Sequence, residues 1–492
     1  MRKLFTTSVL AGLALSSIAQ REIEYVEYDL DNGIHVILHQ EHATPIVAVS
    51  VLYHVGSKNE KTDRTGFAHF FEHLLFEGST NIGRGEYSEL VEKNGGTLNA
   101  NTSHDRTFYY ELLPSNQLEL GIWLESERML HAKVDSEGIE TQRSVVKEEK
   151  RQRIDNQPYA TFIGEMFKRM FNDHPYQWQS IGSMEHLDAA EEVDYVNFYR
   201  TFYVPQNATL SIAGDINIAQ TKDWIAKYFG SIPKGQAINM FRDYELMTDT
   251  DFYNTYSVDK SVFIVNDFTH PKDKKANSVL KSLESKSIDI PRPEKVKMAG
   301  LTGVIKDIIY DNIQLPGLFM AYKFPEQTNE DMYALEIMND VLSGGTSSRI
   351  NKSLVEKKQI AQFAFSFAYG LEDAGMGIFA AIAAKEQSLD DIQTEFDAQI
   401  ELIKKELISQ EEFEKVRNQY ENNFVSSTST VAGIAENLAN SHVYFGNASY
   451  ANTELSKYMN VTREDIQRVA IKYLTQDARI ILHYLPKKEE GK

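Results

Sequence analysis

The sequence predicts an α+β protein made of two homologous domains, each a mixed sheet with helices. Strand-like alternation and helix-like periodicity follow one another along the whole chain, which is the mixed order typical of that class. The second half also repeats the first, and internal similarity of this extent indicates two copies of one fold. The length of 492 residues allows roughly two to four domains. We expect a first domain over residues 20–233 and a second over 291–492.

The first domain is predicted to begin with a hairpin and a central strand. Residues 25–40 (YVEYDLDNGIHVILHQ) read as two strands around an Asp-Asn-Gly turn. Residues 45–55 are rich in β-branched side chains, which are enriched in strands. These three strands are expected to start the first sheet.

The remaining elements of the first domain follow the same two patterns. An apolar helix is expected within residues 66–79, and an amphipathic helix over residues 85–96 ends at Gly95 and Gly96. The later elements are two strands within 97–113, long helices at 116–132 and 136–154, a helix at 195–203, a buried strand at 208–216 and a closing stretch at 218–233.

Three stretches of the second half match stretches of the first. The matched pairs are residues 315–324 with 45–55, residues 331–348 with 65–81, and residues 463–486 with 193–216. Each pair joins elements of the same expected type, so the second domain should repeat the sheet and the principal helices of the first.

The segment between the two domains has a different character. Residues 234–290 are charged and weakly patterned, so we expect an extended linker or an inserted segment. Structureless stretches of this length are uncommon inside compact proteins, which leaves a small domain of its own as the alternative.

Composition excludes several classes of function. A formal net charge of -20 argues against a nucleic-acid binder, because phosphate backbones are bound by basic patches. The sequence contains no cysteine, which excludes disulfides, thiolate metal sites and cysteine nucleophiles. A metal ion would have to be held by His, Asp or Glu.

The N-terminus has the pattern of a secretory signal peptide. Arg2 and Lys3 precede an apolar run, and small residues before position 20 suit cleavage after Ala19. The alternative is a buried first helix. No later run is long enough to span a membrane, so we expect an exported protein, located in a periplasm or outside the cell.

The apolar helix carries an unusual set of ionisable residues. His69, Glu72 and His73 stand in the order H-x-x-E-H within GFAHFFEHLLFEGS, and at about 100° per residue they share one face. Burying these groups unpaired would be costly, whereas two imidazoles one helical turn apart can bind one zinc ion. The matching stretch of the second half has Leu335, Met338 and Asn339 at the three positions, so the trio occurs only once.

A catalytic zinc needs a third protein ligand, and two adjacent glutamates are available in the helix at 136–154. Helical geometry places Glu149 on the same stripe as Ile139, Gln142, Val145 and Val146, while Glu148 faces the other way. A carboxylate on a buried stripe needs a partner, so we expect Glu149 to be the third ligand. An ordinary solvated glutamate is the alternative, and it suits Glu148 better.

The position of Glu72 suits a general base. It lies between the two histidines and can reach the attacking water rather than the metal, take its proton and later pass that proton to a leaving amine. Zinc polarises a carbonyl and makes a water more acidic. The H-x-x-E-H order is a known zinc-peptidase signature, and the expected reaction is hydrolysis of a peptide bond with one Zn²⁺ per chain.

At this point the chain resembles the pitrilysin/insulinase family of zinc peptidases, which includes the mitochondrial processing peptidases. The stretches that carry the resemblance are VGSKNE, GFAHFFEHLLFEGS, GGTLNANTSHDRTFYYELLP, QRSVVKEEKRQRIDNQP, NIQLPGLFMAY and LSGGTSSRI. The resemblance covers most of the chain after residue 19 and is to the smaller, two-domain bacterial type. It implies a fold like that of mitochondrial processing peptidase, forming half of a clamshell.

The resemblance also implies roles for individual residues. His69, His73 and Glu149 correspond to the metal ligands and Glu72 to the catalytic base. Gln142 stands where the family has a glutamate that supports the ligands without touching the metal.

The same resemblance points to a substrate strand. The stretch that contains Asn99 and Ala100 corresponds to a strand whose edge pairs with an extended substrate, so both residues are expected to contact it through their backbone. The alternative is that Asn99 only closes a turn.

One departure from the family concerns the second half. Active members usually carry an Arg and a Tyr seven positions apart after the SSR stretch, where this chain has Val355 and Gln362. Neither side chain can hold and polarise a substrate carbonyl as that pair does. We therefore expect a homologous subunit to donate the pair, unless Arg349 and Tyr369 serve instead.

The sequence thus predicts an exported zinc endopeptidase for short or unfolded peptides, acting as the zinc-bearing subunit of a heterodimer. The alternative from another class is a non-catalytic assembly subunit. The intact trio argues against that alternative, because a scaffold has no use for a general base at Glu72.

Overall fold

The computed structural model describes residues 22–263, 271–295 and 301–487. The expected signal peptide and its cleavage site at Ala19 lie outside these residues. Within the described ranges, no helix is both long and apolar enough to cross a membrane.

A six-stranded mixed sheet forms the centre of the first domain. In spatial order its strands are β1 (Val26–Asp29), β2 (His35–Gln40), β6 (Ala208–Gly214), β3 (Ile46–Tyr53), β5 (Thr107–Pro114) and β4 (Thr97–Thr102). Only β2 and β6 are parallel, and β4 is an edge strand. Every strand predicted for this half is present.

A five-stranded sheet repeats this plan in the second domain. In spatial order its strands are β7 (Ile305–Asp311), β11 (Ile480–Pro486), β8 (Gly317–Phe324), β10 (Gly375–Ala383) and β9 (Ala361–Gly370). It has one parallel pair, β7 and β11, at the position that β2 and β6 occupy in the first sheet, and β9 takes the edge position of β4. The predicted duplication of the fold is therefore confirmed.

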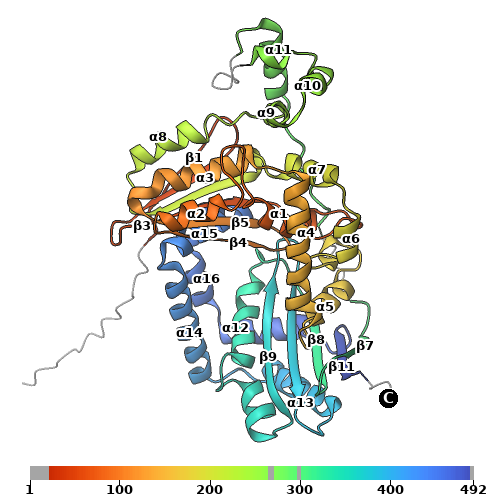
Figure 1. The fold of residues 1–492 in the computed structure, drawn as a ribbon. Coiled ribbons are helices and arrows are strands. Elements are labelled where there is room, and N and C mark those ends of the chain that lie inside the picture. Colours follow the sequence, from red (N-terminus) through yellow and green to blue (C-terminus); the bar gives the residue numbers. More distant parts are fainter. Residues whose placement is uncertain (1–21, 264–270, 296–300, 488–492) are drawn as a thin grey trace, which may run out of the picture.

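Helices cover both sheets (Figure 1). In the first domain they are α1 (Phe67–Leu74), α2 (Glu86–Lys93), α3 (Leu118–His131), α4 (Ser136–Lys150), α5 (Phe162–Met170), α6 (Met184–Ala189), α7 (Glu192–Phe202) and α8 (Ile218–Tyr228). In the second they are α12 (Asp331–Ser343), α13 (Leu389–Lys405), α14 (Gln410–Thr428), α15 (Val431–Phe445), α16 (Glu454–Asn460) and α17 (Arg463–Tyr473). Wider π-helical turns follow at Arg151–Asp155 and Asn351–Lys357, and 3-10 turns lie at Ser57–Asn59, Ser115–Gln117, Pro175–Gln177, Pro205–Asn207, Lys260–Val262 and Ala448–Asn452.

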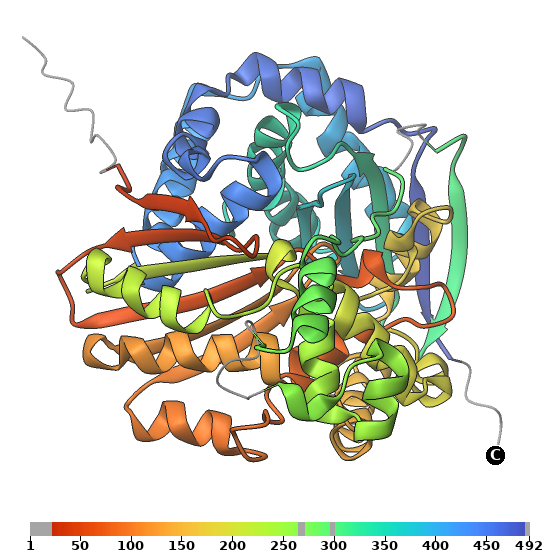
Figure 2. The same ribbon diagram turned by 90° about the horizontal axis from the view of Figure 1, so that it is seen from above.

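Of the two forms expected for the segment 234–290, its described residues form an inserted helical segment rather than an extended linker. It contains α9 (Ala237–Leu246), α10 (Asp249–Tyr256) and α11 (Lys274–Glu284), which share a small apolar cluster that includes Met240 and Phe252. Figures 1 and 2 show these helices, in green, on the outside of the first domain. Its weak sequence pattern follows from its size, since short helices around a small cluster need few apolar positions.

Several contacts join the second domain to the first, and in one of them α5 packs on the second sheet. Helix α15 packs through Ile434, Ala435 and Leu438 on the face of the first sheet that carries Ile37. The turn between β9 and β10 meets the turn Ser57–Asn59, where it buries an ionic cluster described below.

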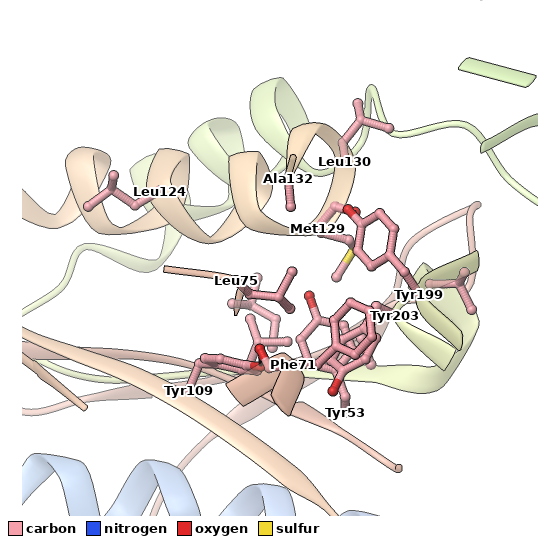
Figure 3. Close-up of a cluster of buried hydrophobic side chains, with 14 of the residues drawn as sticks. Tyr53, Phe71, Leu75, Tyr109, Leu124, Met129, Leu130, Ala132, Tyr199 and Tyr203 are labelled. Atoms are coloured by element: carbon pink, nitrogen blue, oxygen red, sulfur yellow. Dashed lines mark hydrogen bonds between the residues drawn. The ribbon is translucent and has the colours of Figure 1, made fainter. Parts of the chain in front are cut away.

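Helix α1 is held in the core of the first domain (Figure 3). Phe71 packs against Tyr199 and Tyr203 at ring-centroid distances of 6.0 and 5.1 Å, and its carbonyl accepts a hydrogen bond from the Tyr109 hydroxyl at 2.8 Å. Leu75 belongs to the same cluster. The apolar residues of the predicted helix therefore fix its position and leave its polar face to the site.

Candidate metal centre

The site begins with the way in which α1 starts. Gly66 has φ +94°, in the left-handed region, and a β-carbon there would lie 2.9 Å from the carbonyl oxygen of Ile181. The carboxylate of Glu60 accepts hydrogen bonds from the N–H groups of Gly66 and Ala68, both at 2.9 Å. This cap satisfies N–H groups that the first turn leaves unpaired, so it fixes the direction of the helix.

The structure brings His69, His73 and Glu149 together. The Nε2 atoms of the two histidines lie 3.4 Å apart, and Glu149 Oε2 lies 3.5 Å from His69 Nε2 and 3.1 Å from His73 Nε2. His69 is buried, with 8% of its surface exposed, and the other two are half-buried. The three donor atoms thus converge from α1 and α4 on one point.

Their separations fit a zinc ion. Two ligands at about 2.0–2.1 Å from a tetrahedral zinc are about 3.4 Å apart, close to the three distances observed. Two imidazoles and a carboxylate are also the donor types that zinc accepts. Glu149 Oε2 is buried and has no hydrogen-bond partner within the described part of the chain. An oxygen atom that binds a metal ion is expected to lack such a partner when the ion is absent.

The two neighbouring glutamates of α4 differ as predicted. Glu148 faces solvent, where its carboxylate is bonded by Arg151 at 3.2 Å and by Gln152 at 3.1 Å. Glu149 turns inward, and its other oxygen, Oε1, pairs with Arg153 at 2.8 Å. Helical periodicity therefore predicted correctly which of the two glutamates faces inward.

The predicted stripe on α4 needs one correction. Ile139 and Val146 are buried, but Val145 is 44% exposed. At 100° per residue Val145 lies about 60° from Gln142 and 100° from Val146, so it stands at the edge of the stripe rather than within it.

Burial sets the protonation of two groups in the site. Burial lowers the pKa of His69 to about 3, and the charges of His73 and Arg153 act in the same direction, so the imidazole is neutral at pH 7, as a ligand must be. Burial raises the pKa of Glu72, although the Thr102 hydroxyl and His73 partly oppose it. A raised pKa suits a carboxylate that must accept and return a proton.

Gln142 lies in an outer layer of the site. Its side-chain amide donates to Glu77 Oε1, and the Nε atom of Arg84 lies 3.1 Å from Glu77 Oε2. Gln142 thus contacts Glu77 rather than a predicted ligand. The roles of Glu60, Glu77 and Arg153 were missed in the sequence. Glu77 follows His73 by four positions, just beyond the end of α1, and Arg153 follows Glu149 by four, and this proximity in the sequence was the available signal.

Asn99 and Ala100 lie in the middle of the edge strand β4, opposite Tyr110 and Tyr109 of β5. Asn99 is exposed and sits in a strand, so it does not close a turn. The Ala100 N–H donates to Asn99 Oδ1 at 2.9 Å. A peptide that pairs with Ala100 must first displace that side chain.

The residues of the second half that were considered as carbonyl-binding groups are occupied elsewhere. Arg349 makes a two-pronged ion pair with Glu412 at 2.8 and 2.7 Å, and Tyr369 packs on Phe167 with ring centroids 5.3 Å apart. Val355 packs against the core of the second domain, and Gln362 is exposed on β9.

The counterpart of the trio in α12 has no metal-binding chemistry. Leu335 and Met338 are fully buried, and the Asn339 side chain donates to the Leu335 carbonyl at 2.8 Å. The positions that carry the candidate ligands in α1 therefore serve packing in α12.

Family models match both halves of the chain. The model described as Insulinase (Peptidase family M16) matches residues 35–182, and the model described as Peptidase M16 inactive domain matches residues 194–420. The first match contains all the residues of the candidate centre.

Named relatives and solved structures agree with these matches. The chain is 28% identical over 485 residues to Zinc protease PqqE of Helicobacter pylori, covering 96% of each chain, and 21% identical over 457 residues to Uncharacterized zinc protease YmxG of Bacillus subtilis, covering 92% of this chain and 97% of that one. The crystal structure of a protease from Helicobacter pylori superposes with a TM-score of 0.79 at 25% identity, covering 94% and 100% of the two chains. The periplasmic protease PqqL from Escherichia coli has the same fold, with a TM-score of 0.67 at 17% identity over 94% of this chain and 48% of that one.

Proposed function

Because this chain belongs to the insulinase (M16) family of peptidases, in its smaller two-domain type, we propose that it is a zinc-dependent endopeptidase. Its substrates are short or unfolded peptides. One Zn²⁺ per chain is held by His69, His73 and Glu149. The convergence of these three donor atoms at 3.1–3.5 Å is the observation that carries the proposal.

The side chains around that point divide the chemistry between them. Zinc, when bound there, acts as a Lewis acid toward a peptide carbonyl and a water. Glu72 accepts the proton of the attacking water and passes it to the nitrogen of the leaving amine as the C–N bond breaks. The edge of β4 at Asn99 and Ala100 orders the substrate as an added strand, which fixes the scissile bond in front of Glu72.

The remaining half of the active site belongs to a second, homologous subunit in this proposal. No carbonyl-binding Arg and Tyr stand at positions 355 and 362, and the alternatives Arg349 and Tyr369 are engaged within the chain. A chain that matches about half of a longer protein of the same fold also suits one half of a two-part chamber. We therefore expect an Arg and a Tyr from the partner to complete the site.

A non-catalytic assembly subunit is the second candidate. It is favoured by the match of residues 194–420 to an inactive domain and by the absent Arg and Tyr. It leaves unexplained why His69, Glu72 and His73 share one face beside Glu149.

Export is part of the proposal and rests on the N-terminal sequence alone. A basic start, an apolar run and small residues before position 20 suit a signal peptide that is removed after Ala19. The mature protein would then act in a periplasm or outside the cell. N-terminal sequencing of the protein recovered from outside the cytoplasm should begin at Gln20.

Glu72→Gln tests the catalytic role. The variant should keep zinc, because the amide replaces a group that is not a ligand, and it should lose about 10²–10⁴-fold in turnover of a quenched peptide substrate. The measurement is metal content together with turnover, in the presence of the partner chain. If the variant cleaves the substrate as fast as the wild type, Glu72 is not the general base. If the wild-type chain and its partner do not cleave it together, the protein is not a peptidase.

A further inference from the structure

A second group of metal-binding side chains lies away from the candidate centre, on the β1–β2 hairpin. Asp29 pairs with His35 across the two strands, and Glu27, two residues before Asp29, lies on the same face. This is the face of the sheet on which α15 of the second domain packs, since Ile37 of β2 contacts that helix. A histidine and two carboxylates therefore point toward the joint between the two domains.

Helix α15 adds a second imidazole to the group. His442 lies one turn after Leu438, on the stripe that packs against the first sheet. Its ring stacks on the ring of His35, with the centroids 3.6 Å apart and the planes 4° from parallel. Donor atoms of Glu27, His35 and His442 all lie within 4.8 Å of one another.

The contacts of His35 call for a cation or a proton. Its Nδ1 lies 2.7 Å from Asp29 Oδ1, so the N–H at that position donates to the carboxylate. Its Nε2 then faces Glu27 Oε2 at 3.3 Å, where two acceptors meet. Only a positive group between them makes that arrangement favourable.

We propose that Glu27, His35 and His442 form a second zinc site, which joins the first domain to the second. The 3.3 Å between His35 Nε2 and Glu27 Oε2 is close to the roughly 3.4 Å expected for two ligands of one tetrahedral zinc. Asp29 supports the site from outside, as a carboxylate that orients a metal-binding histidine.

Binding requires one movement. The two rings are parallel, so the His442 ring must turn out of the stack for its nitrogen to point at the same ion as His35 Nε2. His35 is already held by Asp29 and is 15% exposed, while Glu27 is 41% exposed and open to solvent. The site is therefore accessible to free zinc and can be filled after folding.

The consequence of binding is mechanical. Glu27 and His35 belong to the first domain and His442 to the second, so one ion would cross-link residues that are 407 positions apart in the chain (442 − 35 = 407). An ion that binds only the folded form stabilises it, so zinc should raise the unfolding temperature through this site as well as through the first.

The test is the zinc content of the full-length chain. After chelator treatment and dialysis against micromolar free Zn²⁺, the wild type should hold two equivalents. His442→Gln should hold one and keep its peptidase turnover with the partner chain, whereas His69→Gln with His73→Gln should also hold one but lose turnover. His42→Gln is the control, because His42 pairs with an aspartate, Asp215, at 2.5 Å as His35 pairs with Asp29, but it lies outside the proposed site.

The affinity of the second site is measured in the His69→Gln, His73→Gln background by competition with a chromophoric chelator. Asp29→Asn should weaken it by about 10–100-fold, as loss of an outer partner does. His442→Gln should abolish it while the metal-free melting temperature stays within a few degrees of that of the parent.

Several outcomes would overturn the second site. They are a single equivalent in the wild type that His442→Gln does not remove, two equivalents in His442→Gln, or filling of the site only at millimolar zinc. A wild type that holds one equivalent which His442→Gln removes would instead refute the first centre and leave the second standing.

Discussion

At the scale of single residues, the centre depends on which of two adjacent carboxylates faces inward. Glu148 and Glu149 have the same chemistry, but one turns to Arg151 and Gln152 in solvent and the other to His69 and His73. A rotation of 100° along the helix decides between a solvated side chain and a proposed ligand.

Glu149→Gln and Glu148→Gln form a matched pair. The first replaces a charged ligand by a neutral amide and should weaken zinc binding by more than about 100-fold, beyond the 10–100-fold typical of outer partners. The second should leave zinc affinity unchanged within about threefold, since exposed ion pairs contribute little. Chelator competition measures both. Equal losses in the two variants would contradict the assignment.

At the scale of elements, α1 is positioned by the residue that precedes it, Gly66, as much as by the core against which it packs. Gly66 combines a left-handed backbone with a close approach to the Ile181 carbonyl, and Glu60 caps the turn that follows. The helix is short, so an error at its start would move both histidines relative to α4. Rigid placement of ligands is what a metal site requires.

Gly66→Ala and Gly85→Ala separate the cost of a left-handed backbone before a helix from the cost of a steric clash at the same position. Both glycines precede a helix with positive φ, +94° and +77°, but a β-carbon at Gly85 would have no atom within 4 Å. Gly85→Ala should cost about 1–2 kcal/mol of unfolding free energy for left-handed strain alone. Gly66→Ala should cost roughly 1–3 kcal/mol more through the clash and should also weaken zinc binding.

Denaturant unfolding and zinc titration of the two variants check this prediction. If the two substitutions cost the same, or if Gly85→Ala is the one that weakens zinc binding, the close approach at Gly66 has no role in placing α1.

At the scale of the whole molecule, an ionic cluster locks the two domains together. Lys58 is buried, and its ammonium group lies 2.9 Å from Asp105, 2.6 Å from Glu372 and 3.3 Å from Asp373. Glu372 also accepts a hydrogen bond from His54 at 2.7 Å. Asp105 comes three residues after the edge strand β4, so the turn of the second domain braces the end of the proposed substrate strand.

The cluster predicts loss of stability in acid. Burial acts to raise the pKa of Glu372, but His54 and Lys58 outweigh it and lower the pKa to about 2, against 4.5 for the free side chain. The contribution of Glu372 is therefore fully present above pH 4.5 and lost as the pH falls toward 2. Its size is on the order of 3 kcal/mol.

Glu372→Gln isolates this contribution. The difference in unfolding free energy between wild type and variant should be present at pH 5 and should shrink steadily as the pH falls from 4.5 to 2.5. A difference that grows in acid, or that is absent at pH 7, would contradict the role of the cluster. Glu148→Gln, which alters an exposed carboxylate, is the control and should show almost no difference.

Local patterns in the sequence predicted the fold and the three converging side chains, because strand alternation and helical periodicity are properties of neighbouring residues. The helical fold of the segment 234–290 and the exposure of Val145 differ from the first expectation for each. Both depend on which surfaces of the folded protein pack against each other. The contacts of Lys58, Glu372 and His442 join positions hundreds of residues apart. No periodicity in one sequence specifies such long-range pairs.

We propose that this chain holds the zinc half of a peptidase site whose other half comes from a homologous chain. The most direct test is turnover of a quenched peptide library by the zinc-loaded chain, alone and mixed with a homologue that carries the Arg and Tyr but lacks the zinc motif. A divided site predicts activity near background for either chain alone and a rise of at least about 100-fold for the mixture, the size expected when a preorganised electrostatic group is restored. Full turnover by this chain alone would contradict a site divided between two chains. Absence of turnover by the mixture would contradict the proposed peptidase activity.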